Sequence, residues 1–215
     1  LIGQRGTSGS QNGYISLVGV FGRESYNFDP ADPRFVTELL IGPLNGGSPA
    51  FGGNLWGAPY ANIRNANILL GATTLVTGVS VAEKEGIRGF AKTIKALDLL
   101  YIIGTRDSIG APIDVDISPT GTPAPFASRT QVYAYIAALL DSAATHLGAA
   151  GTTFPFAMSL GYTGYNTPAQ FLMVNRGLRA RVDVRFVEND DAEARASNPA
   201  GVHVEEMLVL EDAGV

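Results

Sequence analysis

The sequence of 215 residues contains no cysteine. This absence excludes disulfides, cysteine nucleophiles and thiolate metal sites from these residues. Long apolar runs are missing too. The longest, near residues 97–103, contains Asp98 and is far shorter than the ~20 residues that a transmembrane helix needs. No segment is therefore expected to span a bilayer, although a chain of this length can bury a sizeable core without covalent cross-links.

Charged residues are scarce, at 16% of the chain against ~25% in typical globular proteins. The formal net charge is −5 and no basic stripe is present, which argues against binding to nucleic acid or to an anionic membrane surface. Acidic residues gather at one end, where residues 188–215 carry eight of them and one basic residue, Arg195. We predict a separate acidic carboxy-terminal segment there, either a solvated tail or an acidic docking face.

Motifs that carry enzyme chemistry are also missing. The two histidines, His146 and His203, are too far apart for a zinc-ligand spacing, and each is expected at a surface or helix end. Residues 6–9 do not match a nucleophile elbow, and no phosphate-binding or dinucleotide-binding loop is present. Asp114 and Asp116 lack the remaining ligands of a cation site. The sequence thus predicts a protein that is not an enzyme and holds no metal or cofactor.

Four segments show the periodicity of amphipathic helices. The first is predicted over residues 54–70, with Gly71 as its stop signal and an inward face of Trp56, Tyr60, Ile63, Asn67 and Leu70. We expect Trp56 to be largely buried against the second helix, near Phe90 or Ile94. Asn67 on the same face must find a partner, and we expect it to bond a loop backbone.

Each of the other three helices opens with a capping box, in which a Ser or Thr side chain and a Glu or Gln three residues later satisfy backbone amides. The boxes are Ser80–Glu83, Ser128–Gln131 and Thr167–Gln170. The helices are predicted over residues 80–103, over residues 128–148, and from residue 167 until residues 189–191 break the last one. The inward face of the second helix is predicted to be Ile87, Phe90, Ala91, Ile94, Leu97 and Tyr101. That of the third is Val132, Ile136, Leu140, Ala143 and Leu147, and that of the fourth is Phe171, Val174, Leu178, Val182 and Phe186. Gly89 suggests a close approach of a neighbouring helix.

Long loops rich in Gly and Pro separate these helices. Residues 1–54 are predicted to be a loop-rich segment packed on the helices, with short elements at 14–21 and 34–41 that are either helix or strand. Residues 105–127 and 151–166 form two further loops, and long loops on a rigid scaffold commonly carry function. The predicted fold class is an all-α helical scaffold, with its helical domain over residues 55–187.

Five segments, read in order, resemble the SusD/RagB family of outer-membrane nutrient-binding lipoproteins. They are residues 54–67 (with Trp56, Tyr60, Ile63, Asn65 and Asn67), 83–97 (EKEGIRGFAKTIKAL), 110–113 (GAPI), 128–136 (with Ser128, Arg129, Val132, Tyr133 and Ile136) and 169–182. The resemblance implies a tetratricopeptide-like helical scaffold. These 215 residues include neither a cysteine for the family's lipid anchor nor its long carboxy-terminal portion. The matching residues belong to the scaffold and carry over no ligand site.

The resemblance also implies a function, which we state as an expectation. Such a protein is exported to the periplasm or the outer-membrane surface, where a partner or a lipid anchor outside this sequence holds it. It pairs with a TonB-dependent transporter and binds glycans without cleaving them. The candidate ligand-binding residues are the loop aromatics Tyr162 and Tyr165, with Phe154 and Phe156 behind them. The alternative is a structural subunit of a larger membrane-associated complex, in which these aromatics only anchor the loop to the helices.

Overall fold

The protein is all-α, as predicted. The computed structural model describes residues 13–27, 31–44, 54–118 and 120–197, and for residues 54–55 and 187–197 it describes the backbone alone. The elements are α2 (Tyr14–Phe21), α3 (Arg34–Thr37), α4 (Asn54–Leu75), α5 (Val81–Arg106), η2 (Asp107–Ile109), α6 (Arg129–Ala149), η3 (Leu160–Tyr162) and α7 (Pro168–Ser197). Within these residues the only extended pairing is a single bridge between Ala111 and Ala127.

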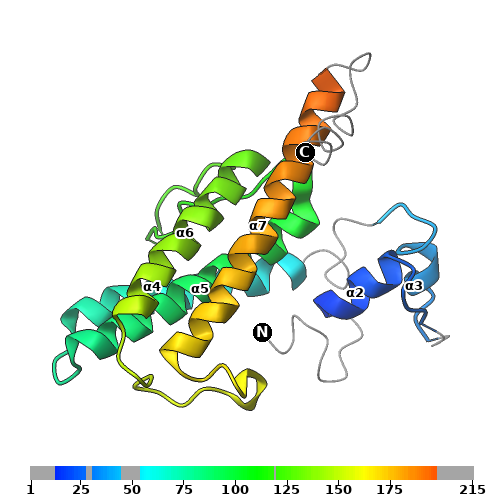
Figure 1. Cartoon of the computed structure of the whole chain (residues 1–215). Coiled ribbons are helices and arrows are strands. Elements are labelled where there is room, and N and C mark those ends of the chain that lie inside the picture. Colours follow the sequence, from blue (N-terminus) through cyan, green and yellow to red (C-terminus); the bar gives the residue numbers. More distant parts are fainter. Residues whose placement is uncertain (1–12, 28–30, 45–53, 119, 198–215) are drawn as a thin grey trace, which may run out of the picture.

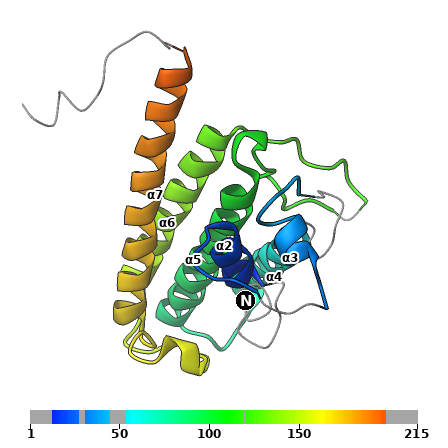
Figure 2. The same cartoon turned by 90° about the vertical axis from the view of Figure 1, so that its right-hand side faces the viewer.

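The four long helices lie side by side in chain order (Figures 1 and 2). Helix α4 packs on α5, α5 on α6 and α6 on α7, with a smaller contact between α5 and α7. Neighbouring helices are antiparallel, because the start of each lies against the end of the next one, as Gly89 of α5 does against Leu147 of α6. The result is two successive helix pairs, α4–α5 and α6–α7, joined by the long loop that ends at Ser128.

The predicted caps explain where α5 and α6 begin. Ser80 Oγ accepts the Glu83 amide at 3.2 Å, and Glu83 Oε2 accepts the Ser80 amide at 2.8 Å. Ser128 and Gln131 exchange the same two bonds. At α7 the box is incomplete. The Thr167 hydroxyl oxygen accepts a hydrogen bond from the Gln170 amide, but the Gln170 side chain accepts one from the Thr167 hydroxyl and not from the Thr167 amide. The caps at Ser128 and Thr167 each fix one end of a long loop, whereas Ser80 follows a short connection from α4.

Three helix ends were predicted wrongly. Helix α5 continues past residue 103, its predicted end, to Arg106. Helix α4 continues past Gly71 to Leu75, since one interior Gly costs only ~1 kcal/mol and the next turn buries Thr73. Helix α7 continues through residues 189–191 to Ser197, because each Asn or Asp costs less than ~1 kcal/mol in a helix and no Pro intervenes. The predicted start of the acidic segment at residue 188 therefore falls inside α7. Residues 198–215 lie outside the described residues.

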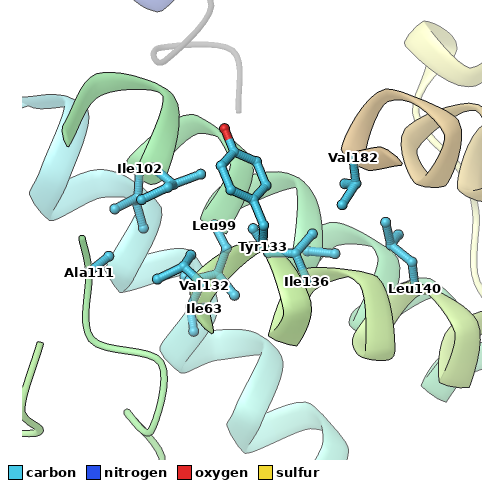
Figure 3. Close-up of a cluster of buried hydrophobic side chains, with 11 residues drawn as sticks. Ile63, Leu99, Ile102, Ala111, Val132, Tyr133, Ile136, Leu140 and Val182 are labelled. Carbon is cyan, nitrogen blue, oxygen red and sulfur yellow. The ribbon is translucent and has the colours of Figure 1, made fainter. Parts of the chain in front are cut away.

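The main core lies between α4, α5, α6 and α7, as Figure 3 shows. Its fully buried members include Ile63, Leu99, Ile102, Val132, Ile136, Leu140 and Val182. The predicted inward face of α6 is buried along its whole length. Gly89 does mark a close approach, because a Cβ there would lie 2.6 Å from Leu147 Cγ. None of the described helices is long and apolar enough to cross a membrane.

The interpretation of Trp56 was wrong. Its ring is half-buried, stacks on Phe126 with centroids 5.7 Å apart, and lies 5.1 Å from the Arg106 guanidinium. Because α4 and α5 are antiparallel, the start of α4 meets the end of α5. Ile94 is 12 residues from Arg106, or about 18 Å along the helix. The described partner of Asn67 is not a loop backbone either: the Asn67 side-chain oxygen accepts a hydrogen bond from the buried Lys95 ammonium at 2.9 Å.

The described part of the amino-terminal segment contains two short helices. Both short elements are helices, and α2 and α3 enclose a small cluster of their own, made of Leu17, Val20, Phe35 and Leu39. Helix α2 reaches the main array through Tyr14, whose ring lies 4.6 Å from that of Tyr101 on α5. Residues 1–12, 28–30 and 45–53 lie outside the described residues, so the predicted packing of the whole segment applies to its described parts alone.

Candidate functional site

Three of the four candidate aromatics anchor the loop between α6 and α7. Phe154 is buried, and Phe156 and Tyr162 are half-buried. Their rings surround Phe90 of α5 and Phe171 of α7: the Phe90 centroid lies 5.1 Å from those of Phe156 and Phe171, and Tyr162 lies 5.6 Å from Phe171. Such contacts stabilise packing. These three rings therefore hold the loop against the ends of two helices.

The fourth aromatic faces solvent. Tyr165 is 44% exposed, and Leu160 nearby is 92% exposed. The backbone between them is regular, since the amides of Tyr162, Thr163 and Tyr165 donate to carbonyls three residues earlier. The loop lies at the adjacent ends of α6 and α7 (Figure 1). It thus presents apolar side chains on a backbone that its own bonds and the aromatic anchors hold in place.

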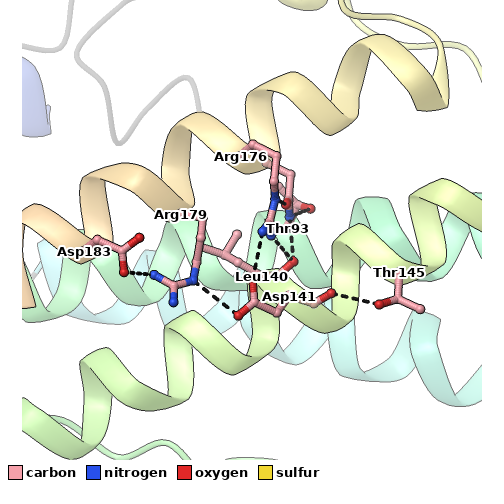
Figure 4. Close-up of polar contacts among 8 residues, drawn as sticks. Thr93, Leu140, Asp141, Thr145, Arg176, Arg179 and Asp183 are labelled. Atoms are coloured by element: carbon pink, nitrogen blue, oxygen red, sulfur yellow. Dashed lines mark hydrogen bonds and ion pairs between the residues drawn. The ribbon is translucent and has the colours of Figure 1, made fainter.

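A polar network fixes the two helices that carry this loop, and Figure 4 shows it. Arg176 of α7 donates to Asp141 at 2.8 Å and to the Leu140 carbonyl at 2.9 Å, both on α6. Asn175 is fully buried and donates to the same carbonyl and to Thr93 of α5. The Arg176 bond is the largest cause that holds the pKa of Asp141 below its ordinary value. The sequence does not predict this network, because no spacing within α7 indicates partners on α6.

The histidine His146 also joins two helices. Its Nδ1 pairs with Glu85 of α5, and its Nε2 lies 2.9 Å from the Lys92 ammonium. The hydrogen bond to His146 holds the pKa of Glu85 below its ordinary value, and Arg88 adds to this effect. Burial lowers the pKa of Lys92, which also donates to Ser142 Oγ at 2.7 Å.

This network does not have the geometry of an activated nucleophile. A serine nucleophile needs a base that accepts its proton. The Ser142 oxygen instead accepts a bond from the Lys92 ammonium, and the imidazole faces that ammonium and not the hydroxyl. The arrangement is an interhelical ion-pair network on α5 and α6. His203 lies outside the described residues.

The described residues contain no group of three or more His, Asp or Glu side chains that could hold a metal ion. Asp114 and Asp116 are both exposed in the loop after η2.

Comparisons of the chain with protein-family models, with curated proteins and with solved structures found no match. The SusD/RagB resemblance therefore stays a prediction from the sequence.

Proposed function

We propose that the protein is a non-catalytic, SusD-like binding protein of the periplasm or outer-membrane surface. In this proposal a tetratricopeptide-like array of α4 to α7 carries the loop of residues 151–166, which contacts a membrane-protein partner such as a TonB-dependent transporter. The observation that carries the proposal is that the loop has two kinds of apolar side chain, some packed on the helices and some exposed. Three aromatics are anchored on the helices, while Leu160 and Tyr165 stay exposed.

An ordered apolar loop is suited to contact with a protein. Residues 151–166 contain no charged side chain, so their exposed surface is weakly hydrated. Because the backbone is already held in one conformation, binding costs less ordering entropy than it would for a flexible loop. Tyrosine is also among the side chains that contribute most at protein interfaces. The two antiparallel helix pairs support the scaffold part of the proposal, since such pairs are the unit of tetratricopeptide arrays.

Two leucines allow a matched test. Leu160 is 92% exposed in the loop, and Leu75 is 83% exposed at the end of α4. We expect Leu160→Glu combined with Tyr165→Ala to abolish co-purification of the tagged chain with a transporter from the outer membrane of its native cells. Leu75→Glu should leave the yield of transporter unchanged. Equal recovery with both variants would reject the loop as the contact.

Glycan binding is the second part of the proposal, and Tyr165 carries it. Its ring is the most exposed of the four candidates, so it is the one available to stack on a sugar. A glycan array should show binding that is lost in Tyr165→Ala and kept in Leu75→Glu. If no glycan binds while a membrane complex still co-purifies, the alternative of a structural subunit is the correct version of this function. Size-exclusion chromatography of the isolated chain then distinguishes a monomer from a subunit that needs its complex.

A further inference from the structure

A cavity of about 270 Å³ lies where α2 meets α5, α6 and α7. The cavity is distinct from the loop of residues 151–166. That loop packs near Phe90, whereas the cavity is lined by Gly104, which lies about 20 Å from Phe90 along α5. Its polar lining comes from four helices and the turn after α5. These side chains are Tyr14, Tyr101, Tyr133, Asp107, Arg181 and Arg185.

Two arginines of α7 supply positive charge to one side of the cavity. Arg181 and Arg185 are four residues apart, so they share one face of the helix. Both are exposed, and Arg181 forms no ion pair with any described residue. Arg181 and Arg185 line the same cavity as Tyr14, and their charges oppose the rise that burial causes in the pKa of Tyr14. Two neighbouring guanidinium groups are the usual protein ligand of a carboxylate or phosphate.

Three tyrosines supply ring surface and hydroxyl groups. The rings of Tyr14 and Tyr101 are tilted against each other with centroids 4.6 Å apart. Tyr133 is buried at the edge of the main core, and Figure 3 shows its hydroxyl pointing away from the hydrophobic cluster. A tyrosine phenol is protonated at neutral pH, so the Tyr14 hydroxyl can donate a hydrogen bond there.

The other side of the cavity accepts hydrogen bonds. It is lined by Ile103 and Gly104 in the last turn of α5, at the negative end of the helix dipole, where the Ile103 carbonyl already accepts the Asp107 amide. The Asp107 carboxylate lies beside them, held by Arg129 at 2.9 Å. A bare anion would be attracted by one wall and repelled by the other. The two walls together fit a molecule with an acidic group at one end and hydroxyl groups at the other.

We propose that this cavity binds a hydroxylated carboxylate of the size of a single sugar acid. The carboxylate pairs with Arg181 and Arg185, and the hydroxyl groups donate to the Asp107 carboxylate. The ring of Tyr101 or Tyr14 covers the carbon skeleton. A volume of about 270 Å³ lies just below the ~300–1,000 Å³ of drug-sized ligand sites, so it suits one monosaccharide unit. The proposal is independent of the loop function above and stands if the loop binds no partner.

Isothermal titration calorimetry of the whole chain with glucuronate tests the proposal, with glucose and inorganic phosphate as the other two ligands. Glucose lacks the charge, and phosphate lacks the carbon skeleton. We expect glucuronate to bind, and each of Arg181→Gln and Arg185→Gln to weaken it at least tenfold. Tyr14→Phe, which keeps the ring, should weaken it less. Arg64→Gln, at an exposed arginine of α4, should leave its affinity unchanged.

Each other outcome overturns the proposal. Absence of glucuronate binding would leave the cavity without this ligand class. Phosphate binding as tight as glucuronate binding would show that charge alone is recognised. Glucuronate binding that survives both arginine substitutions would place the ligand elsewhere. Circular dichroism of the variants verifies that a loss of binding does not come from loss of the helices, and if an arginine variant unfolds, Tyr14→Phe still decides the location.

Discussion

The two ends of α5 are both surrounded by aromatic rings, yet one end is closed and the other is open. At its start, Phe90 lies among the rings of Phe154, Phe156, Phe171 and Tyr162, and three of these four have no polar atoms. At its end, Tyr101 lies among tyrosines and arginines that line a cavity. A phenol needs a hydrogen-bond partner and a phenylalanine ring does not. We infer that the start of α5 contributes mainly to stability, whereas the end of α5 presents polar groups to the proposed ligand.

The largest effect is expected at the closed end. Phe171 is fully buried at the centre of the aromatic cluster. Phe171→Ala should lower the free energy of unfolding by ~3–5 kcal/mol, because it removes contacts and leaves a cavity. Urea denaturation followed by circular dichroism measures this loss. Tyr165→Ala is the control and should change stability by less than ~0.5 kcal/mol, since that ring is exposed. Equal losses would show that the loop is core throughout.

The next effect concerns the contact of α5 with α6 between the two ends. A Cβ on Gly89 would lie 2.6 Å from Leu147 Cγ and 3.0 Å from its backbone nitrogen, so Gly89→Ala should destabilise by ~1–3 kcal/mol. Gly71 of α4 has nothing within 4 Å of the same position. Gly71→Ala should therefore stabilise by ~0.5–1 kcal/mol, through helix propensity alone. Opposite signs in thermal unfolding are the expected result, and a stabilising Gly89→Ala would contradict the close approach.

The sequence predicted local features of the fold well. The stripe of Ile136, Leu140 and Leu147 predicted the buried face of α6, and the caps at Ser80 and Ser128 predicted where two helices begin. These features depend on residues within a turn or two of one another. Helix ends were predicted less well, because a single Gly71 or the polar residues 189–191 cost less than the packing or propagation of the helix contributes.

Pairings between helices could not be predicted from one sequence. The partner of Asn67 is Lys95, 28 residues away, and Trp56 lies near Arg106 because α4 and α5 run in opposite directions. The candidate aromatics were identified by composition, which cannot distinguish an anchored ring from an exposed one. The cavity lining was missed for the same reason, since Tyr14 and Arg181 meet only when α2 and α7 pack on the same end of α5.

A smaller effect depends on pH. The pKa of Glu85 is lowered from its ordinary 4.5, first by the hydrogen bond to His146. A carboxyl group with a lowered folded-state pKa contributes stability above its unfolded pKa and loses it as the pH falls through the folded pKa. The melting temperature of the wild type should therefore fall below pH 4.5 more steeply than that of Glu85→Gln, by an amount equivalent to at most ~1 kcal/mol. Parallel curves for the two proteins would show that this pair does not couple α5 to α6.

The smallest effect on stability is expected at the open end, and it completes the comparison. Arg176 and Arg181 lie on the same helix, but Arg176 bonds Asp141 and the Leu140 carbonyl, whereas Arg181 forms no ion pair with a described residue. Arg176→Gln should lower the free energy of unfolding by about 1 kcal/mol, as the loss of such bonds does. Arg181→Gln should change it by less than ~0.5 kcal/mol, because its side chain lines a cavity and carries no packing. Urea denaturation without ligand measures both values. A loss at Arg181 as large as that at Arg176 would mean that this arginine supports the helices, and the two ends of α5 would then differ in their residues but not in their role.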